Sequence, residues 1–297
     1  LVNHCLLGAA EADGNALRQS MALCRLGQGK LLAGQPAAAE PLLSAALDLV
    51  ATTSAWEVMA DVYHWLAVCH RQGRRAEAAI NLQLAAVELA QQTARTDHLL
   101  RALEELALLW QAQPDGVEQA EHFFPARIQY LEAQRQGDAA ARVRRLLGDL
   151  YQRAGHGEAA RSLYHEAEAH FRAVEAGLET FVTALRLAEG HALEGQPQRA
   201  LDVLQSARQE WGGPGDPAAE SRVLLAAAQA LQDVGDAAAA LDCYLEARRL
   251  LDAIGDRDGV IRMLDVIGGL YFHLGDQAKS TRCYEERLQL QAVASPS

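Results

Sequence analysis

A helical unit that recurs about every 40 residues constrains this chain more than any other feature of its sequence. In each unit a turn, usually marked by glycine, follows a run of helical period and precedes a helix rich in small residues. The turns fall at Gly34, Gly73, Pro114-Asp115-Gly116, Gly155, Gly195, Gly235 and Gly275. The glycine steps are 39 (73 − 34), 82 (155 − 73, with the turn near 115 inside it), 40, 40 and 40. A fixed period of this size predicts a solenoid, in which each unit buries its apolar face against its neighbours.

The stretch from Leu146 to Phe171 shows the unit most clearly. Small and aromatic residues recur there at helical spacings of three, four and seven on the two sides of the turn. These positions are Leu147, Gly148 and Tyr151 before the turn, and Ala160, Tyr164 and Ala167 after it. We expect Gly148 and Ala160 to lie where the two helices cross, because a larger side chain would push the backbones apart.

The same frame assigns core positions in the other repeats, and it is least regular in the second and third. After Gly73 it places Ala78, Leu82 and Ala85 in the core of the second repeat. In the third repeat Pro125 interrupts the second helix, and an interior proline removes a backbone hydrogen bond, so we expect a kink or a late helix start there. This irregularity would either change the direction of the solenoid, form a site of contact, or be chance variation in one of about seven repeats, which solenoids tolerate.

The composition agrees with an all-helical protein and excludes several classes. Half of the residues are hydrophobic but only 5% are aromatic, and alanine and leucine, good helix formers, supply most of the apolar content. The net charge of −12 argues against nucleic acid as a partner. The five cysteines form no CxxC pair, so we expect free thiols and a cytoplasmic location. The sequence has no run of 18 apolar residues, so it predicts no membrane span.

The repeat array is expected to occupy residues 14–292. Residues 1–13 read either as half of a further repeat or as a capping helix, and residues 293–297 as a disordered tail. The segment 212–217 breaks a helix but keeps the 40-residue step, which favours a long loop between repeats over a domain boundary. Leu1 is not an initiator methionine, which leaves open the removal of an N-terminal segment.

Three segments suggest catalytic or ligand-binding motifs, and each fails on spacing or residue type. Residues 27–30 lack the first glycine and the hydroxyl residue of a phosphate-binding loop. His165 and His170 are five residues apart, whereas a zinc-binding helix needs histidines four apart on one face. Residues 255–259 lack the later ligands of a calcium loop and read as a turn between repeats. We therefore expect no enzymatic activity, no catalytic residue, no metal site and no cofactor.

The pattern of large, small and aromatic residues before the turn and small, aromatic and small residues after it resembles the tetratricopeptide repeat. The resemblance covers about residues 14–290, and the period near 40 resembles the long-helix subclass found in scaffolds and in sensory parts of signalling proteins. It implies a right-handed superhelical solenoid of antiparallel helix pairs, about seven in number. It also implies a concave groove, lined by the first helix of each pair, that receives a peptide or helix of a partner protein.

Two functions are compatible with this resemblance. The first is a scaffold for protein–protein interaction that binds a partner peptide in the groove. The second is a regulatory or sensory segment of a larger signalling protein, which senses a ligand or controls an attached effector domain. Nothing in the sequence indicates the oligomeric state.

The repeat frame predicts which side chains line the groove in the C-terminal half. They are Arg142, Arg145, Asp149 and Gln152 in the fourth repeat, Leu185 and Glu189 in the fifth, Arg222, Leu225, Gln229 and Gln232 in the sixth, and Arg262, Asp265 and Phe272 in the seventh. Arginine suits carboxylates through its paired planar donors, so the set predicts a partner peptide with acidic residues, whose apolar side chains contact the leucines and Phe272. Alternatively, the arginines pair with Asp149, Glu189 and Asp265 and only stiffen the array.

Overall fold

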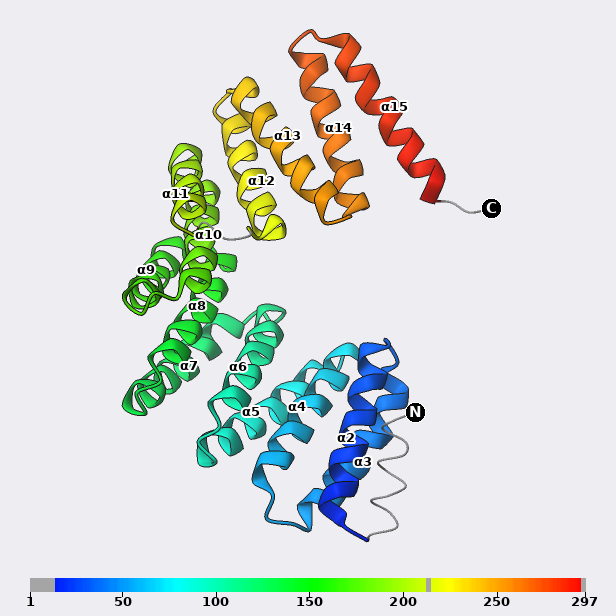
Figure 1. Cartoon of the computed structure of the whole chain (residues 1–297), viewed down its shortest axis with the longest axis vertical. Coiled ribbons are helices and arrows are strands. Elements are labelled where there is room, and N and C mark those ends of the chain that lie inside the picture. The colour runs from blue at the N-terminus through cyan, green and yellow to red at the C-terminus, as the bar shows by residue number, and fades with distance from the viewer. Residues whose placement is uncertain (1–13, 212–214, 295–297) are drawn as a thin grey trace. The chain divides into compact units, whose positions relative to one another are not determined.

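The computed structural model describes residues 14–211 and 215–294, with side chains as far as residue 291. Within these residues the chain is a succession of α-helices joined by short turns, without any strand, as the sequence predicts (Figure 1). The predictions for residues 1–13 and for the last three residues of the tail concern residues outside this part of the chain. The last helix continues to Ala294, so the helical array ends later than the predicted limit at 292.

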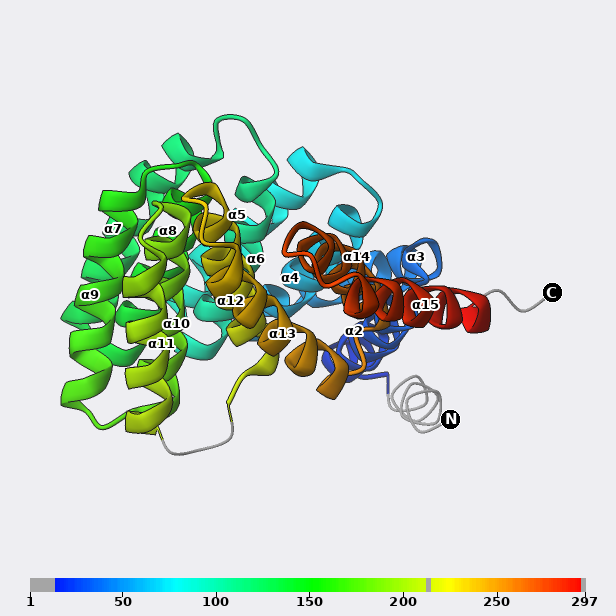
Figure 2. The ribbon, with the colours of Figure 1, turned by 90° about the horizontal axis from the view of Figure 1, so that it is seen from above.

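The helices form two compact units, which are described separately. The first contains α2 (Ala16–Leu32), α3 (Pro36–Ala51), α4 (Trp56–Gln72), α5 (Ala76–Gln92), α6 (Thr96–Gln111), α7 (Gly116–Ala133) and α8 (Gly137–Arg153). The second contains α9 (Gly157–Ala173), α10 (Gly177–Leu193), α11 (Pro197–Trp211), α12 (Pro217–Asp233), α13 (Ala237–Ala253), α14 (Arg257–His273) and α15 (Gln277–Ala294). Even-numbered helices are the first helices of the repeats and odd-numbered ones the second helices. In both views α10 lies beside α11, and α12 beside α13 (Figure 1, Figure 2).

In six of the seven described repeats, the turn between the two helices contains one residue in the left-handed backbone conformation, whereas the turn of the third repeat, at residues 112–115, has none. Gly34, Gly155, Gly195, Gly235 and Gly275 have φ angles between 70° and 86°, a region that glycine enters without steric cost. The equivalent residue in the second repeat is Arg74, with φ 59°, and not Gly73. The sequence prediction, which assigned this turn to its glycine, was therefore displaced by one residue.

This displacement also moves the predicted core of α5. The fully buried positions of α5 include Ala79, Gln83 and Ala86, each following a predicted core residue (Ala78, Leu82, Ala85) by one. The corrected step from Gly34 to Arg74 is 40 residues (74 − 34), the same as in the C-terminal repeats.

A single small residue recurs at the same position of each first helix, where the repeat frame predicts contact with the second helix. These residues are Gly27, Ala67, Ala107, Gly148, Ala188, Ala228 and Gly268. At two of them the crowding is measurable. A Cβ on Gly27 would lie 2.6 Å from Cγ of Leu43, and one on Gly268 would lie 3.0 Å from Cζ of Tyr284. The predicted crossing of Gly148 and Ala160 involves residues of both units and stays a prediction.

The irregular third repeat carries one extra residue and an unbroken helix. Ala67 and Ala107 are 40 residues apart, whereas Ala107 and Gly148 are 41 apart. Pro125 lies on an exposed position within α7, which begins at Gly116, so the predicted late helix start is wrong. Phe124 beside it is fully buried and contacts Trp110 edge-on. The repeat thus keeps its aromatic core position in spite of the proline.

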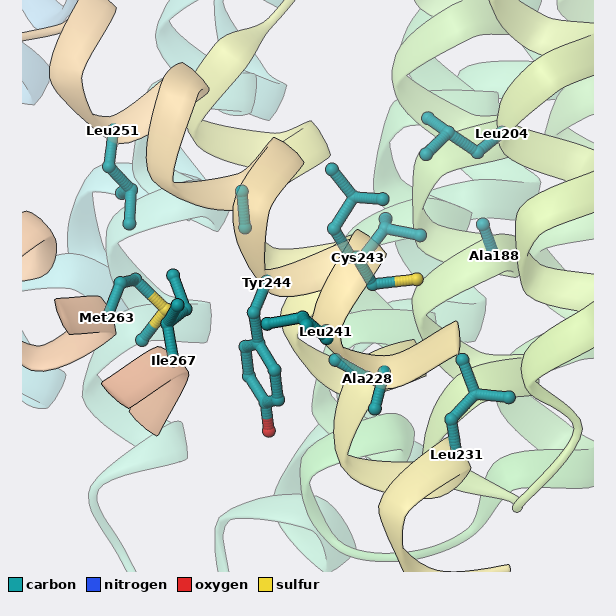
Figure 3. Close-up of a cluster of buried hydrophobic side chains, with 14 of the residues drawn as sticks. Ala188, Leu204, Ala228, Leu231, Leu241, Cys243, Tyr244, Leu251, Met263 and Ile267 are labelled. Atoms are coloured by element: carbon teal, nitrogen blue, oxygen red, sulfur yellow. The ribbon is translucent and has the colours of Figure 1, made fainter. Parts of the chain in front are cut away.

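The core of the second unit consists of alanine, leucine and a few larger side chains from consecutive repeats. Tyr244 lies between Ala228 and Leu241 on one side and Met263 and Ile267 on the other (Figure 3). The predicted turn at residues 255–259 is confirmed only at its start: Gly255 has φ 72°, whereas residues 257–259 begin α14, which the Asp256 carboxylate caps by accepting from the Gly259 N–H. The described cysteines, Cys24, Cys69, Cys243 and Cys283, are free and buried; Cys5 lies outside the described residues.

We predict that Ala160→Leu lowers the free energy of unfolding by about 1–3 kcal/mol, because this alanine is fully buried and a leucine would overpack the site. The neighbouring Ala159 is exposed on the same helix, so Ala159→Leu is a matched control that should change stability little. Urea unfolding followed by circular dichroism measures both. Equal midpoints for Ala160→Leu and the parent protein would show that the repeat frame is wrong.

Candidate functional site

The first helices of the second unit carry nine of the predicted groove residues, and we call their outward side the first-helix face. It is defined by Glu189 of α10, Arg222, Leu225, Gln229 and Gln232 of α12, and Arg262, Asp265 and Phe272 of α14. The ninth, Leu185, is only 2% exposed and belongs to the hydrophobic core with Val223 and Leu224 of the next repeat. The prediction that Leu185 contacts a partner is therefore wrong.

The two arginines of this face are exposed and held only loosely. The Arg222 side chain is 45% exposed, and its Nε lies 3.9 Å from Oε1 of Glu189. The Arg262 side chain is 68% exposed, and its Nη2 lies 4.0 Å from Oδ2 of Asp256. Charge-assisted hydrogen bonds between arginine and carboxylate are usually about 2.7–2.9 Å long. Both guanidinium groups thus keep donors for another acceptor.

The other polar residues of the face are already engaged. Asp265 accepts from Arg287 of α15 and does not pair with either arginine of the face, so that part of the alternative reading is wrong. Gln229 donates to Asp233 at 3.1 Å, and Gln232 accepts from the hydroxyl of Tyr244 at 2.6 Å. These contacts lie along α12 or between neighbouring helices, so they fix the side chains that surround the arginines.

Two apolar side chains accompany these arginines. Phe272 is 60% exposed near the end of α14, a large exposed fraction for a phenylalanine. Leu225 is half-buried on α12 and packs against the core. The first-helix face therefore offers loosely paired guanidinium groups together with apolar surface.

The remaining four predicted residues, Arg142, Arg145, Asp149 and Gln152, lie on α8 of the first unit. All four are half-buried there. The predicted set is thus divided between the two units, and its assembly into one groove stays a prediction.

The first unit contains a buried polar site that the sequence prediction missed. Gln83 of α5 is fully buried at a position that Leu43, Tyr164 or Tyr244 occupies in other repeats. Its Nε2 donates to the carbonyl oxygen of Ala102 at 3.0 Å and lies 3.1 Å from Nδ1 of His64. An amide nitrogen donates hydrogen bonds and does not accept them, so Nδ1 of His64 is the acceptor and the imidazole is neutral. The signal for this site was present in the sequence, but the one-residue frame shift at Gly73 hid it.

Charged groups surround this site on α4 and α6. Arg101 donates to Asp61 at 3.0 Å, and Arg71 pairs with the buried carboxylate of Glu105. Burial is the main cause that lowers the pKa of His64 to about 4, and the charges of Arg101 and His98 lower it further. In contrast to the arginines of the first-helix face, Arg71 and Arg101 are thus committed to carboxylates of neighbouring helices.

Neither a metal-binding cluster nor a membrane-spanning helix occurs in the described part of the chain. These residues include no group of three or more histidine, cysteine or acidic side chains placed to hold a metal ion. None of the described helices combines the length and apolar content that crossing a bilayer requires.

Comparison with known proteins places the fold but not a family. No protein-family model matches the sequence, and no curated protein matches it. Among solved structures, the chain is similar to the STAND signal transduction ATPase with a tetratricopeptide repeat sensor from Pyrococcus horikoshii, with a TM-score of 0.66 and 14% identity over 93% of this chain and 43% of that one. It is also similar to aspartyl phosphate phosphatase F from Bacillus subtilis, with a TM-score of 0.61 and 12% identity over 96% of this chain and 74% of that one.

A third similar structure is a Rap protein in complex with Competence and Sporulation Factor. Its TM-score is 0.55, with 13% identity over 96% of this chain and 78% of that one. At these identities the matches establish the fold. The chain has an all-α, tetratricopeptide-like helical repeat fold, as the sequence pattern predicts.

We predict that lowering the pH from 6.5 towards 4 destabilises the protein by up to about 3 kcal/mol through His64 alone. In this window the unfolded chain binds a proton that the folded chain does not, so stability falls as pH falls. Urea unfolding of the parent and of His64→Gln across this range isolates the contribution, and His273→Gln at an exposed position is the control. An unchanged pH dependence in His64→Gln would contradict the neutral, buried imidazole.

Proposed function

We propose that this chain is a protein-interaction module whose first-helix face in the second unit binds a partner peptide or helix with acidic and apolar side chains. The observation that carries the proposal is the loose pairing of Arg222 and Arg262, whose nearest carboxylates lie at 3.9 and 4.0 Å. Long, exposed side chains on a packed helix usually contribute little to stability, whereas they are well suited to capture an approaching carboxylate.

The second helices of the same unit show the contrast. There Arg208 donates to Glu246 at 2.8 Å, and Arg172 donates to Glu210 at 3.1 Å, each across two successive repeats. Those arginines join repeats together. The arginines of the first-helix face make no contact of comparable length in the described structure with Glu189 or Asp256, so a partner carboxylate would gain two donors from each at little cost to the fold.

The apolar part of the site supports a peptide over a small anion. Phe272 and Leu225 give the face surface that an anion alone would not use, and aromatic anchors together with arginine are typical of interface centres. The Rap structure named above, which is held in complex with Competence and Sporulation Factor, shows that a fold of this kind accepts a bound partner.

A second candidate function is that of a sensory segment within a longer signalling protein. The match to the STAND protein favours it, because this chain aligns with 43% of a protein that is described as having a tetratricopeptide repeat sensor. The coding sequence on both sides of these residues tests this candidate. An attached ATPase, DNA-binding or other effector domain supports it, and flanking stop and start codons with no such domain contradict it.

We predict that a fluorescein-labelled peptide of repeating Glu-Leu-Gly units binds the parent protein and that Arg222→Glu with Arg262→Glu weakens this binding about tenfold or more. Fluorescence anisotropy measures the affinity. Arg249→Glu with Arg282→Glu changes the net charge equally at exposed positions of second helices and should leave the affinity within about twofold. Equal losses in the two variants would reduce the effect to net charge and contradict the site.

A further inference from the structure

A pocket of 390 Å³ lies on the opposite side of the repeats, between the second helices α9 and α11 and above α10. All of its lining residues belong to the second unit, and none is among the predicted groove residues. Its volume is within the range of about 300–1,000 Å³ that is typical of ligand sites. The pocket is therefore a separate place at which the chain can hold a partner group.

An ion pair that joins successive second helices in the next two repeats is missing at the pocket. In α11 and α13 the twelfth helix residue is an arginine, and it pairs with the tenth residue of the following second helix, a glutamate. These pairs are Arg208 with Glu246 at 2.8 Å and Arg248 with Glu286 at 2.5 Å. At the same positions α9 has Glu168 and α11 has Ser206, and both line the pocket. A carboxylate and a short hydroxyl cannot bridge the gap as arginine and glutamate do.

The floor of the pocket is apolar and aromatic. Phe181 of α10 is 2% exposed and stacks on Trp211 of α11, with ring centroids 6.3 Å apart and planes inclined by 22°. Gly177 makes room for this tryptophan, because a Cβ at that position would lie 2.7 Å from Cζ3 of the indole. The aromatic pair is thus set in place by the start of α10, and it provides a preformed surface for an apolar group.

The rim of the pocket is strongly acidic. It carries four carboxylates, Glu168, Glu175, Asp202 and Glu210, and a single guanidinium, Arg172, which gives a formal charge of −3 (1 − 4). Arg172 donates to Glu168 and to Glu210, at 3.1 Å in each case, and so spans the mouth from α9 to α11. Asp202 accepts only from the neutral amide of Gln198, at 3.3 Å, and Glu175 lies in an exposed turn. Among the described residues, two of the four carboxylates are therefore without a compensating cation.

We propose that this pocket receives a basic, apolar segment of a partner protein, with an arginine or lysine side chain next to a leucine-like residue. The cationic end would lie between Glu175 and Asp202, and the aliphatic stem and the neighbouring apolar side chain would lie along Trp211, which the buried Phe181 supports from beneath. Long basic side chains bury their stems and keep their charge at the surface, which matches an apolar floor under an acidic rim. Charge complementarity makes this partner the opposite of the one proposed for the first-helix face.

The experiment uses a fluorescein-labelled peptide of repeating Arg-Leu-Gly units and records both anisotropy and the indole N–H signals of the four tryptophans. We expect binding that shifts the Trp211 signal and leaves those of Trp56, Trp65 and Trp110, all in the first unit, unchanged. Glu168→Arg with Ser206→Glu restores the ion pair of the later repeats and should abolish the binding. Glu158→Arg with Gln205→Glu makes the same charge change on exposed residues of α9 and α11 outside the pocket and should not.

A second variant tests the rim if the restored pair disturbs folding. Glu175→Gln with Asp202→Asn should weaken the Arg-Leu-Gly peptide about three- to tenfold, since two partly screened attractions are lost. Three results would overturn the proposal: equal binding of the Glu-Leu-Gly peptide with a shift of Trp211, full affinity in the restored-pair variant, or shifts confined to other tryptophans. Free arginine amide that binds as tightly as the peptide would identify a small-cation pocket and would also contradict it.

Discussion

The close approach of two helices at one small residue in each repeat is the constraint on which the rest of this structure depends. At Gly27 there is no room for a Cβ beside Leu43, and at Gly268 the ring of Tyr284 occupies that space. Such contacts fix the rotation of each first helix about its axis, because only the side with the small residue lets the second helix approach closely. The side opposite the contact then becomes available for binding. The first-helix face and the gaps between second helices both follow from this one choice.

Charge is distributed differently on these two sides of the second unit. Between second helices, arginine and glutamate of successive repeats pair at short range and join the repeats, as Arg208 and Glu246 do. On the first-helix face, Arg222 and Arg262 remain exposed and loosely paired. Exposed ion pairs contribute little to stability. An arginine that is left loosely paired on the first-helix face, instead of joining two second helices, therefore costs the fold little and gives the surface a binding group. One scaffold can thereby present exposed arginines on its first helices and an acidic pocket between its second helices in the same unit.

Much of the fold could be predicted because the small and aromatic positions recur at nearly constant steps. The repeat frame predicted from the sequence was wrong where the preference of glycine for the left-handed turn position did not apply. The left-handed turn residue of the second repeat is Arg74, although glycine stands next to it, and this shifted the core of α5 and concealed the buried Gln83. Backbone conformation at a single residue is decided by the packing of both helices, which a sequence pattern does not contain.

The site could be predicted only in part, for a related reason. Leu185 and Leu225 have the same place in their repeats, yet the first is in the core and the second is half-buried, because exposure depends on the side chains of the next repeat. The acidic pocket depends on residues 38 apart, where Glu168 and Ser206 replace an arginine and a glutamate. A reading that follows one helix at a time cannot detect a missing pair between two helices, whereas the structure shows it directly.

The central claim is that partner recognition in the second unit uses the outward side of its first helices. Hydrogen–deuterium exchange with and without an excess of the Glu-Leu-Gly peptide tests it most directly, because it reports where binding stabilises the backbone. The account predicts slower exchange in α12 and α14, with little change in α13 and α15. Slower exchange confined to α11, α13 and α15 would contradict it and would place the acidic partner on the second helices instead.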